Sequence, residues 1–353
     1  MIREVRKGEE LNAESLKKFL LNNKLITDYK SDIKIQQFSN GFSNLTYLIK
    51  IESRELVLRL PPKGAKFGHD MSREFKVLCG LNKGFDKVPK AYCFSDDIQI
   101  LGAPFYIMER IEGIILSIDE ASSRNIRPLE YKKVAQNWLD SFVELHNLDF
   151  KKIGLSDLGK PEGYVERQVK NWGKQYLKAA TEEIPEAKKV MNWLEKNQPK
   201  KYTHSLIHND YKYDNVVFTD NSWNEINAIL DWEMSTLGDP LMDLGTSLAY
   251  WTIASDNEMI LNVMNYPTSN KGNPSRMELV DMYQFKRKIK INDLVFYYTY
   301  GLFKISVIVQ QIYYRYSKGF TNNKKFKDLN QMTKLLLKLG WQSIQKQKIE
   351  KLF

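Results

Sequence analysis

Acidic and amide side chains recur at short spacing in residues 208–215, which read His-Asn-Asp-Tyr-Lys-Tyr-Asp-Asn, and a further aspartate follows the apolar run that ends at Leu230. Asp210 and Asn215 lie five residues apart, and Asp231 is the later aspartate. Phosphoryl transfer uses a set of this kind: one carboxylate orients the attacking hydroxyl and accepts its proton, while an amide and a second carboxylate hold magnesium against the nucleotide phosphates. A His-x-Asp triplet alone occurs by chance, so the inference depends on the spacing and on the surrounding elements.

An antiparallel hairpin is expected directly after this run. Residues 216–218 and 226–230 are apolar and β-prone, and residues 219–224 are polar and turn-like. Antiparallel pairing would bring Asn215, at the start of the first strand, beside Asp231, at the end of the second. Two oxygen ligands at one point suit a hard cation such as Mg²⁺, which keeps most of its waters. The alternative is a hairpin with polar ends and no metal.

A helix is expected to begin at the Asp-Pro pair of residues 239 and 240. Asp239 can cap the free N–H groups, and Pro240 fits the first helical position because its missing N–H would be unpaired there anyway. Asp243 then lies one turn into the helix and near its apolar face. A buried carboxylate needs hydrogen bonds, so we expect Asp243 to accept them from the backbone of residues 208–215. The alternative is an exposed first-turn aspartate that interacts with the helix dipole.

These residues give the sequence a resemblance to the aminoglycoside phosphotransferase and choline kinase superfamily, which has a two-lobed protein-kinase-like fold. Within it, the sequence is most similar to the phosphotransferase group related to the kinase domains of some acyl-CoA dehydrogenases, from residue 33 to the C-terminal helices. The resemblance implies that Asp210 is catalytic and that Asn215 and Asp231 bind magnesium. It also implies that Asp243 supports the catalytic loop.

His208 and Asn209 are the two positions directly before Asp210. The resemblance implies a structural role for His208, so we do not assign it as a base. Many members have glycine where this chain has Asn209. Asparagine tolerates a positive φ better than most other residues, so this departure agrees with the assignment.

The N-terminal part has the pattern of a small antiparallel sheet. Residues 33–38 and 46–51 alternate as strands around a polar loop that contains Ser43 and Asn44. Backbone N–H groups and hydroxyls of such a loop can contact phosphates, and the loop resembles the nucleotide loop of the family. The alternative is an ordinary hairpin.

A third strand, residues 55–60, carries Arg59 where most members of the superfamily have lysine. Arginine keeps the positive charge but binds phosphate with a different geometry. Its expected partner is Glu74 in the following helix. Residues 104–113 then resemble an interlobe hinge, and in the family such a segment binds adenine, which implies contacts with Met108, Glu109 and Ile111. The alternative for the first pair is an exposed strand arginine and a solvated glutamate.

The remainder is expected to be helical. Apolar residues at three- and four-residue spacing predict a helix over 131–149 that contains His146, interpreted as a packing or hydrogen-bonding residue. The most apolar stretch, residues 294–303, is followed by Lys304 and is too short to span a bilayer, so it is interpreted as a buried helix. Residues 284–316 are expected to form two helices broken near Gly301.

Composition describes an ordinary folded protein. The chain has 353 residues, 42% of them hydrophobic and 27% charged, and a formal net charge of +10. Lysines occur singly and in pairs and no nucleic-acid motif accompanies them, so we expect no nucleic-acid partner. Residues 1–10 are charged and no apolar run follows them, so no signal segment is expected. We expect no membrane partner and a cytoplasmic location.

The whole pattern predicts an α+β protein with the two-lobed protein-kinase-like fold. The expected small lobe, residues 1–108, is an antiparallel sheet with a helix; residues 109–113 form the hinge; residues 114–353 form a mainly helical lobe with the catalytic hairpin. We expect transfer of the γ-phosphoryl group of ATP, with GTP as the alternative, to a hydroxyl of a small molecule, with Mg²⁺ as cofactor. The resemblance implies a hydroxyacyl-CoA or another hydroxylated metabolite as the acceptor. The alternatives are an inactive nucleotide-binding pseudokinase and an aminoglycoside or choline kinase.

Other classes fit less well. A protein kinase needs a long activation segment, but only seven residues separate Asp231 from Asp239. An aminoglycoside site should be acidic, whereas Lys and Arg outnumber Asp and Glu in residues 246–320. The first observation disfavours a protein kinase, and the second disfavours polycationic antibiotics as acceptors.

Overall fold

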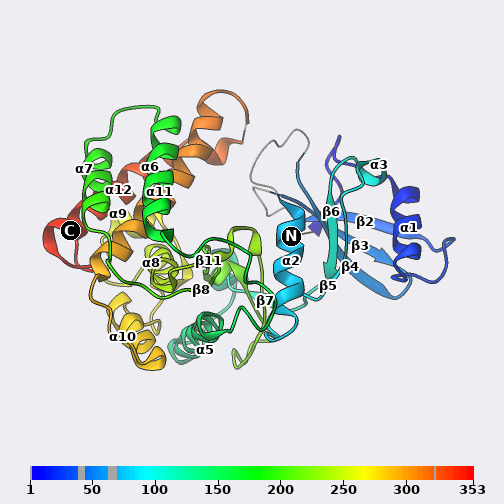
Figure 1. The fold of residues 1–353 in the computed structure, drawn as a ribbon, viewed down its shortest axis with the longest axis horizontal. Helices are drawn as coiled ribbons and strands as arrows, with labels where there is room; N and C mark the ends of the chain where they lie inside the picture. The colour runs from blue at the N-terminus through cyan, green and yellow to red at the C-terminus, as the bar shows by residue number, and fades with distance from the viewer. Residues whose placement is uncertain (1, 39–43, 63–69, 322) are drawn as a thin grey trace. The chain divides into compact units, whose positions relative to one another are not determined.

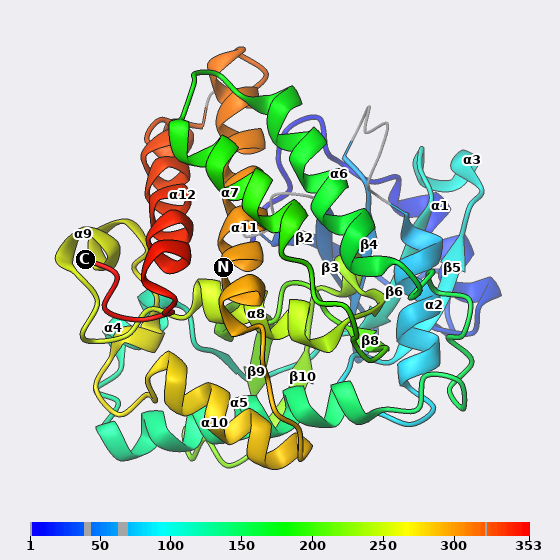
Figure 2. The same cartoon turned by 60° about the vertical axis from the view of Figure 1, so that its left-hand side comes forward.

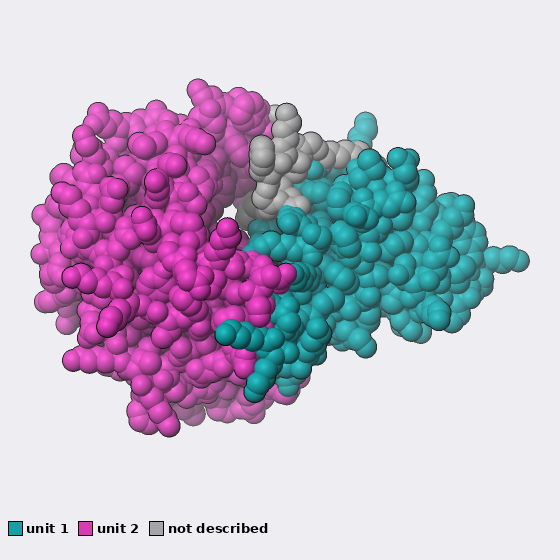
Figure 3. Space-filling model, in the orientation of Figure 1, with its two compact units in different colours: residues 1–112, 151–155, 227–233 teal, residues 113–150, 156–226, 234–353 magenta. Residues whose placement is uncertain are grey.

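The computed structural model describes residues 2–38, 44–62, 70–321 and 323–353. The chain forms two compact units, coloured separately in Figure 3. Unit 1 comprises residues 1–112, 151–155 and 227–233, and unit 2 comprises residues 113–150, 156–226 and 234–353.

Unit 1 is built on a six-stranded antiparallel sheet with the strand order β1-β2-β3-β4-β6-β5. Side chains on one face pack against helix α1 and form an apolar core. Helix α2 packs against β5 and β6 (Figure 1). The elements are β1 (Ile2–Arg3), α1 (Ala13–Asn22), β2 (Ile33–Phe38), β3 (Leu45–Ile51), β4 (Arg54–Leu60), α2 (Met71–Leu81), β5 (Ala91–Ser95), α3 (Ile98–Leu101) and β6 (Phe105–Glu109).

The alternation of strand β4 explains how Arg59 reaches α2. Leu58 and Leu60 belong to the core that includes α1, and successive side chains of a strand point to opposite faces. Arg59 therefore points to the other face, where it meets Glu74 of α2. The N-cap Asp70 accepts a hydrogen bond from the Arg73 N–H and starts that helix.

Unit 2 is mainly helical. Helix α11 packs against α6, α8 and α12, and α12 also packs against α7 (Figure 2). Strand β7 pairs with β9, and β11 pairs with β8. The elements are β7 (Ile114–Ile115), α4 (Ile118–Ser123), α5 (Pro128–Asn147), α6 (Tyr164–Ala179), α7 (Pro185–Lys196), β8 (Ser205–Ile207), the 3₁₀ turn η1 (Tyr213–Asn215), β9 (Val216–Phe218), β11 (Thr236–Gly238), α8 (Pro240–Tyr250), α9 (Glu258–Val263), η3 (Pro267–Ser269), α10 (Arg276–Arg287), α11 (Leu294–Ser317), η4 (Lys324–Phe326) and α12 (Leu329–Lys346).

The hairpin expected after residue 215 is present. Strand β9 is followed by a turn that the Thr219 N–H closes by donating to the Glu225 carbonyl at 3.1 Å. Strand β10 (Ile226–Ile229) begins in unit 2, and its later residues belong to unit 1, as does the short turn η2 (Trp232–Met234) up to Glu233. The strand bounds agree with the expected ones, except that β10 ends one residue earlier than expected.

The prediction of a helix break near Gly301 is wrong. Gly301 lies inside α11, and the break falls instead between α10 and α11. A Cβ atom at Gly301 would lie 2.2 Å from the Gly245 carbonyl oxygen of α8, and one at Gly245 would lie 2.1 Å from the Tyr297 carbonyl oxygen. Both glycines therefore allow two helices to approach closely, and neither ends its helix.

Within the described ranges, no helix combines the length and the hydropathy needed to cross a membrane. Helix α11 is the long apolar element that the sequence predicted, and it is buried along most of its first four turns. It therefore serves as the central packing element of unit 2.

Candidate functional site

Asp210 lies in unit 2 among hydrogen-bond donors. The Asn215 Nδ2 donates to the Asp210 backbone oxygen at 2.8 Å and to its Oδ2 at 3.0 Å, because the 3₁₀ turn η1 folds Asn215 back toward the loop. The Lys212 Nζ lies 3.1 Å from the same Oδ2. The Asp210 side chain is 16% exposed. A carboxylate in this position is ordered by its neighbours and remains accessible to a small hydroxyl compound.

An aromatic group adjoins this carboxylate. The Lys212 Nζ lies 4.7 Å from the centre of the Tyr250 ring, and the Tyr250 hydroxyl is near enough to Asp210 for the carboxylate to act on it. Burial, together with the charge of Asp210, raises the pKa of Tyr250 well above its ordinary value, so its hydroxyl stays protonated. Tyr250 can therefore serve as a donor to Asp210.

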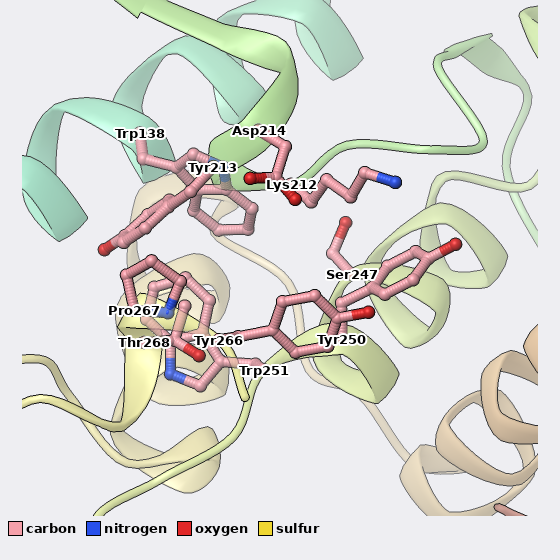
Figure 4. A pocket seen from close by; sticks show the side chains of 10 residues that line it. All are labelled: Trp138, Lys212, Tyr213, Asp214, Ser247, Tyr250, Trp251, Tyr266, Pro267 and Thr268. Carbon is pink, nitrogen blue, oxygen red and sulfur yellow. The ribbon is translucent and has the colours of Figure 1, made fainter. Parts of the chain in front are cut away.

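A cavity of about 10 Å³ lies beside Lys212, roughly the space of one water molecule. Figure 4 shows Lys212 and Asp214 on one side of it and the rings of Tyr266 and Trp251 on the other. Half of the residues that line it are aromatic, and it is too small to hold a substrate. The residues around it are Trp138, Lys212, Tyr213, Asp214, Ser247, Tyr250, Trp251, Tyr266, Pro267 and Thr268.

The Asp243 side chain binds the backbone of the loop that contains Asp210. Its Oδ1 accepts from the Asn209 N–H at 2.8 Å, and its Oδ2 accepts from the His208 N–H at 2.6 Å. The side chain is fully buried, so the expected backbone hydrogen bonds are confirmed and the exposed alternative is wrong. His146 of α5 adds its Nε2 at 3.2 Å from Oδ2, as a hydrogen-bonding residue.

The surroundings of Asp243 stabilise the ionised form of its side chain. Burial alone would raise its pKa, but the hydrogen bond and charge of His146, with the charges of His208 and Lys304, bring the pKa below the usual value. Burial in turn lowers the pKa of His146. Asp243 is therefore an ionised acceptor at neutral pH.

The start of helix α8 follows the sequence pattern. Asp239 is its N-cap, with Oδ1 accepting from the Leu241 N–H at 2.9 Å, and Pro240 takes the first turn, as predicted. Tyr297 of α11 donates its hydroxyl to the Asp239 Oδ2 at 2.9 Å. Burial raises the pKa of Asp239 to about 6. The capped end of α8 thus fixes the position from which Asp243 reaches the loop.

His208 and Asn209 shape the backbone before Asp210. The buried His208 ring accepts from the Asp210 N–H at its Nδ1, at 3.3 Å. Asn209 has φ of 69°, the left-handed region that favours glycine. Asparagine is the residue type, after glycine, that enters this region at least cost, so Asn209 can stand where relatives have glycine.

In unit 1, three carboxylates surround Arg59. Its Nη1 donates to the Glu74 Oε1 at 2.6 Å, and its Nη2 donates to the Asp231 Oδ1 at 2.7 Å and to the Glu233 Oε2 at 3.1 Å. The Arg59–Glu74 pair is confirmed, and both side chains are buried. Asn44 donates from Nδ2 to the Glu233 Oε2 at 2.7 Å.

Burial and neighbouring charges act in opposite directions on the Arg59 guanidinium. Burial would lower the pKa of Arg59, but Glu74 and Asp231 raise it well above its ordinary value, while burial raises the pKa of Glu74. Asp231 and Glu233 are the more exposed of the three carboxylates, at 34% and 20% of their side-chain surface, so they are the two that solvent and ions can reach.

Carboxylate and amide oxygens are ligand types that suit Mg²⁺, which is usually bound by one or two carboxylates together with phosphates and water. Asp231 offers a carboxylate, and Asn215 offers its Oδ1 because its Nδ2 is engaged by Asp210. In the part of the chain that the structure describes, no three His, Cys, Asp or Glu side chains form a metal-binding group by themselves. The expected pairing of Asn215 with Asp231 stays a prediction.

The remaining expected nucleotide contacts are less defined. Met108 and Glu109 end strand β6, and the Glu109 N–H donates to the Lys90 carbonyl at 2.8 Å. Ile111 follows the strand and is partly buried. Their contacts with adenine stay a prediction, and Ser43 lies outside the described residues.

Four residues near these groups were not assigned from the sequence. Lys212 is two residues after Asp210, and Glu233 is two residues after Asp231, so the motif itself contained a signal for both. Tyr250 and Lys304 carry no local signal, because helices α8 and α11 bring them to the loop from distant parts of the chain.

Comparison with known proteins shows the family. The model of the phosphotransferase enzyme family matches residues 34–279. The chain is 30% identical to acyl-CoA dehydrogenase family member 10 of Mus musculus, over 96% of this chain and 32% of that protein. It is 33% identical to acyl-CoA dehydrogenase family member 11 of Rattus norvegicus, over 83% of this chain and 38% of that protein. The chain thus spans about a third of the length of these relatives.

Solved structures agree on the fold. A Ralstonia eutropha protein, provisionally named an aminoglycoside phosphotransferase, superposes with a TM-score of 0.80 at 28% identity, over 96% of this chain and 99% of that one. Choline kinase from Cryptosporidium parvum gives 0.60 at 14% identity, over 97% of this chain and 100% of that one. An aminoglycoside 2′-phosphotransferase solved with GDP gives 0.58 at 14% identity, over 92% and 98%.

The predicted α+β, protein-kinase-like fold class is confirmed by these neighbours. The family model covers well over half of the chain and includes Arg59, residues 208–215 and helix α8. The chain therefore belongs to the phosphotransferase enzyme family.

Proposed function

We propose that this protein transfers the γ-phosphoryl group of ATP, with GTP as the alternative donor, to a hydroxyl group of a small molecule. The observation that carries the proposal is the environment of Asp210, whose Oδ2 lies 3.0 Å from the Asn215 Nδ2 and 3.1 Å from the Lys212 Nζ. A carboxylate ordered in this way can orient an acceptor hydroxyl and take its proton. Asp210 is the residue proposed for that step.

The phosphates of the nucleotide need positive charge. Arg59, held by Glu74 at 2.6 Å, is the cation proposed to neutralise them. Asn44 and Ser43 are proposed to contact the phosphates, and Met108, Glu109 and Ile111 are proposed to lie against adenine. The GDP in a neighbour of the same fold supports a purine nucleotide as the ligand.

Asn215 and Asp231 are proposed to hold Mg²⁺. When bound, Mg²⁺ supplies positive charge to phosphate oxygens and thereby lowers the barrier to transfer. Asp243 keeps the loop that carries Asp210 in place through the His208 and Asn209 N–H groups. His208 and Asp239 have structural roles in this scheme.

The proposed acceptor is a hydroxyacyl-CoA or a similar hydroxylated metabolite. The relatives named acyl-CoA dehydrogenases motivate this class, since this chain covers about a third of each of them. Residues 246–320 contain more Lys and Arg than Asp and Glu, which disfavours polycationic aminoglycosides and favours an anionic acceptor.

Two measurements test the proposal. Isothermal titration should show ATP binding that is strengthened by Mg²⁺ in the wild type and in the exposed control Asp86→Ala, with the strengthening lost in Asp231→Ala. ATP turnover should then be screened with hydroxyacyl-CoAs, aminoglycosides, choline and sugars. ATP turnover that depends on one acceptor would identify the substrate class. ATP binding without turnover on any acceptor class would support an inactive nucleotide-binding protein. The absence of ATP binding would overturn the proposal.

A further inference from the structure

A lysine is buried in the middle of the central helix of unit 2. Lys304 lies on α11 and is 1% exposed. Its Nζ donates to the Asn209 carbonyl oxygen at 2.6 Å and to the Asn209 Oδ1 at 3.0 Å, and it lies 6.0 Å from the centre of the Trp172 ring. An ammonium away from water is costly unless it is hydrogen-bonded and balanced by charge, so a specific contact must offset this cost.

The charge on Lys304 is maintained by the site it contacts. Burial lowers its pKa to about 8, while the charges of Asp243 and Asp210 oppose that decrease. At neutral pH the group is therefore an ammonium with three donors. Two of these donors have an acceptor in the residue directly before Asp210.

Asn209 is held at every polar atom. Its N–H donates to the Asp243 Oδ1, and its Nδ2 donates to the Met234 carbonyl at 3.0 Å. Tyr164 adds a contact with the same amide at 3.3 Å. The Asn209 carbonyl oxygen and Oδ1 both accept from the Lys304 Nζ. The residue therefore keeps its left-handed conformation through partners on several elements.

The peptide that joins Asn209 to Asp210 is consequently fixed at both ends. Lys304 holds its oxygen, and the His208 Nδ1 accepts from its N–H. Asp243 accepts from the two preceding N–H groups. Lys304 and His208 are thus side chains that hold the last peptide before the Asp210 carboxylate, and Lys304 is the one that holds its oxygen.

We propose that Lys304 is a positioning residue for phosphoryl transfer, which fixes the Asn209–Asp210 peptide and thereby directs the Asp210 carboxylate. This inference rests on the proposed function, in which Asp210 orients the acceptor hydroxyl. It assigns to α11 a part in catalysis as well as in packing.

Lys304→Met tests the role, because methionine has a similar length and no donor. Gln310→Met is the matched control: Gln310 is buried on the same helix, and its Nε2 donates to the Ala179 carbonyl at 2.9 Å and to Thr181 at 3.0 Å. Both variants remove a buried polar side chain from α11, but only the first removes a contact with the loop. If Lys304→Met does not fold, Lys304→Gln, whose shorter amide cannot reach the same oxygen, is measured in its place.

The first readout is amide hydrogen exchange, which does not depend on activity. Peptides covering residues 205–215 should exchange about tenfold faster or more in the Lys304 variant, since the loop loses a partner. The same peptides should be unchanged in Gln310→Met, whose effect should fall near residues 179–181. Unchanged exchange at 205–215 in the Lys304 variant would overturn the proposal.

The second readout is ATP turnover with the acceptor found in the screen. A small displacement of a reacting group costs about 100-fold in rate, so kcat should fall by about 10- to 100-fold while the KM for ATP stays within about threefold. Gln310→Met should keep the wild-type kcat. Faster loop exchange with unchanged kcat would overturn the positioning role; faster exchange with no turnover by the wild type would retain the contact and overturn the proposed function instead.

Discussion

Replacing Asp243 by Asn removes one acceptor from a fully buried site. The carboxylate accepts from two backbone N–H groups, at 2.6 and 2.8 Å, and lies 3.2 Å from the His146 Nε2. An asparagine side chain has a single acceptor oxygen, so its NH₂ group would face one of these donors. Asp243→Asn therefore leaves a buried N–H group without a partner while keeping the size of the side chain.

The magnitude follows from the burial. A hydrogen bond to a charged acceptor contributes about 1.5–3 kcal/mol, and an orphaned buried donor costs about 1–3 kcal/mol. Solvent does not screen these contacts, since Asp243 is 0% exposed. We expect a loss of about 3–5 kcal/mol in the free energy of unfolding, the range for removing one partner of a buried pair. That is a large share of the about 5–15 kcal/mol that stabilises a typical protein.

Urea unfolding followed by tryptophan fluorescence measures this loss, because six of the seven tryptophans belong to unit 2. The product of the m-value and the midpoint shift gives the change in free energy. Asp281→Asn, on the exposed side of α10, is the control and should leave the midpoint unchanged. A loss below about 1 kcal/mol at pH 7 would refute the inferred role of Asp243, which rests on this range.

The pH dependence provides an independent check. The folded chain lowers the pKa of Asp243, so the stabilisation from its ionised form is present above the unfolded value of about 4 and is lost as the pH falls further. The difference between wild type and Asp243→Asn should therefore be full at pH 7 and shrink only below about pH 4. A difference that stays constant down to the lowest pH at which the protein folds would contradict the ionised state.

Three further changes test other parts of the structure by the same unfolding measurement. Arg59→Met should destabilise by about 3–5 kcal/mol because it leaves the buried Glu74 charge unpaired, and the double variant with Glu74→Met should recover most of that loss; equal losses would contradict the pairing. Asp239→Asn keeps the cap acceptor but removes a carboxyl whose pKa is raised to about 6 in the folded protein. The wild type loses stability from pH 4 to pH 6 because this carboxyl must ionise while buried, so the free energy of unfolding of the variant should rise relative to that of the wild type, by about 3 kcal/mol at most. Gly301→Ala should destabilise by about 1–3 kcal/mol or more, because its Cβ would meet the Gly245 carbonyl oxygen at 2.2 Å; a neutral effect would mean that α8 and α11 can separate without cost.

Local patterns in the sequence, together with the family resemblance, predicted much of the fold and several contacts of the site. The Asp239–Pro240 pair predicted the start of α8, and the resemblance to the family predicted the pairing of Arg59 with Glu74. The position of Asp243 on an apolar helix face predicted its bonds to the loop. In each case the chemistry depends on residues within one element or on a motif of defined spacing.

Contacts between distant elements could not be predicted in this way. Lys304 follows a long apolar run, and a charged residue in that place indicates the exposed end of a helix, whereas the structure buries it against Asn209. Glycine favours a helix break, so Gly301 predicted one. Only the close approach of α8 shows that the missing side chain lets the two helices pack together. Both positions take their meaning from a partner more than fifty residues away in the sequence.

The central claim is that Asp210 is the catalytic aspartate of a small-molecule kinase. Asp210→Asn keeps the shape of the side chain and removes its ability to accept a proton. Asp220→Asn is the matched control, because Asp220 is exposed and accepts from the Ser222 N–H within the hairpin turn. We predict that acceptor-dependent ATP turnover falls by about 100-fold or more in Asp210→Asn, with ATP affinity unchanged, and that Asp220→Asn retains wild-type turnover. Wild-type turnover in Asp210→Asn would contradict the account.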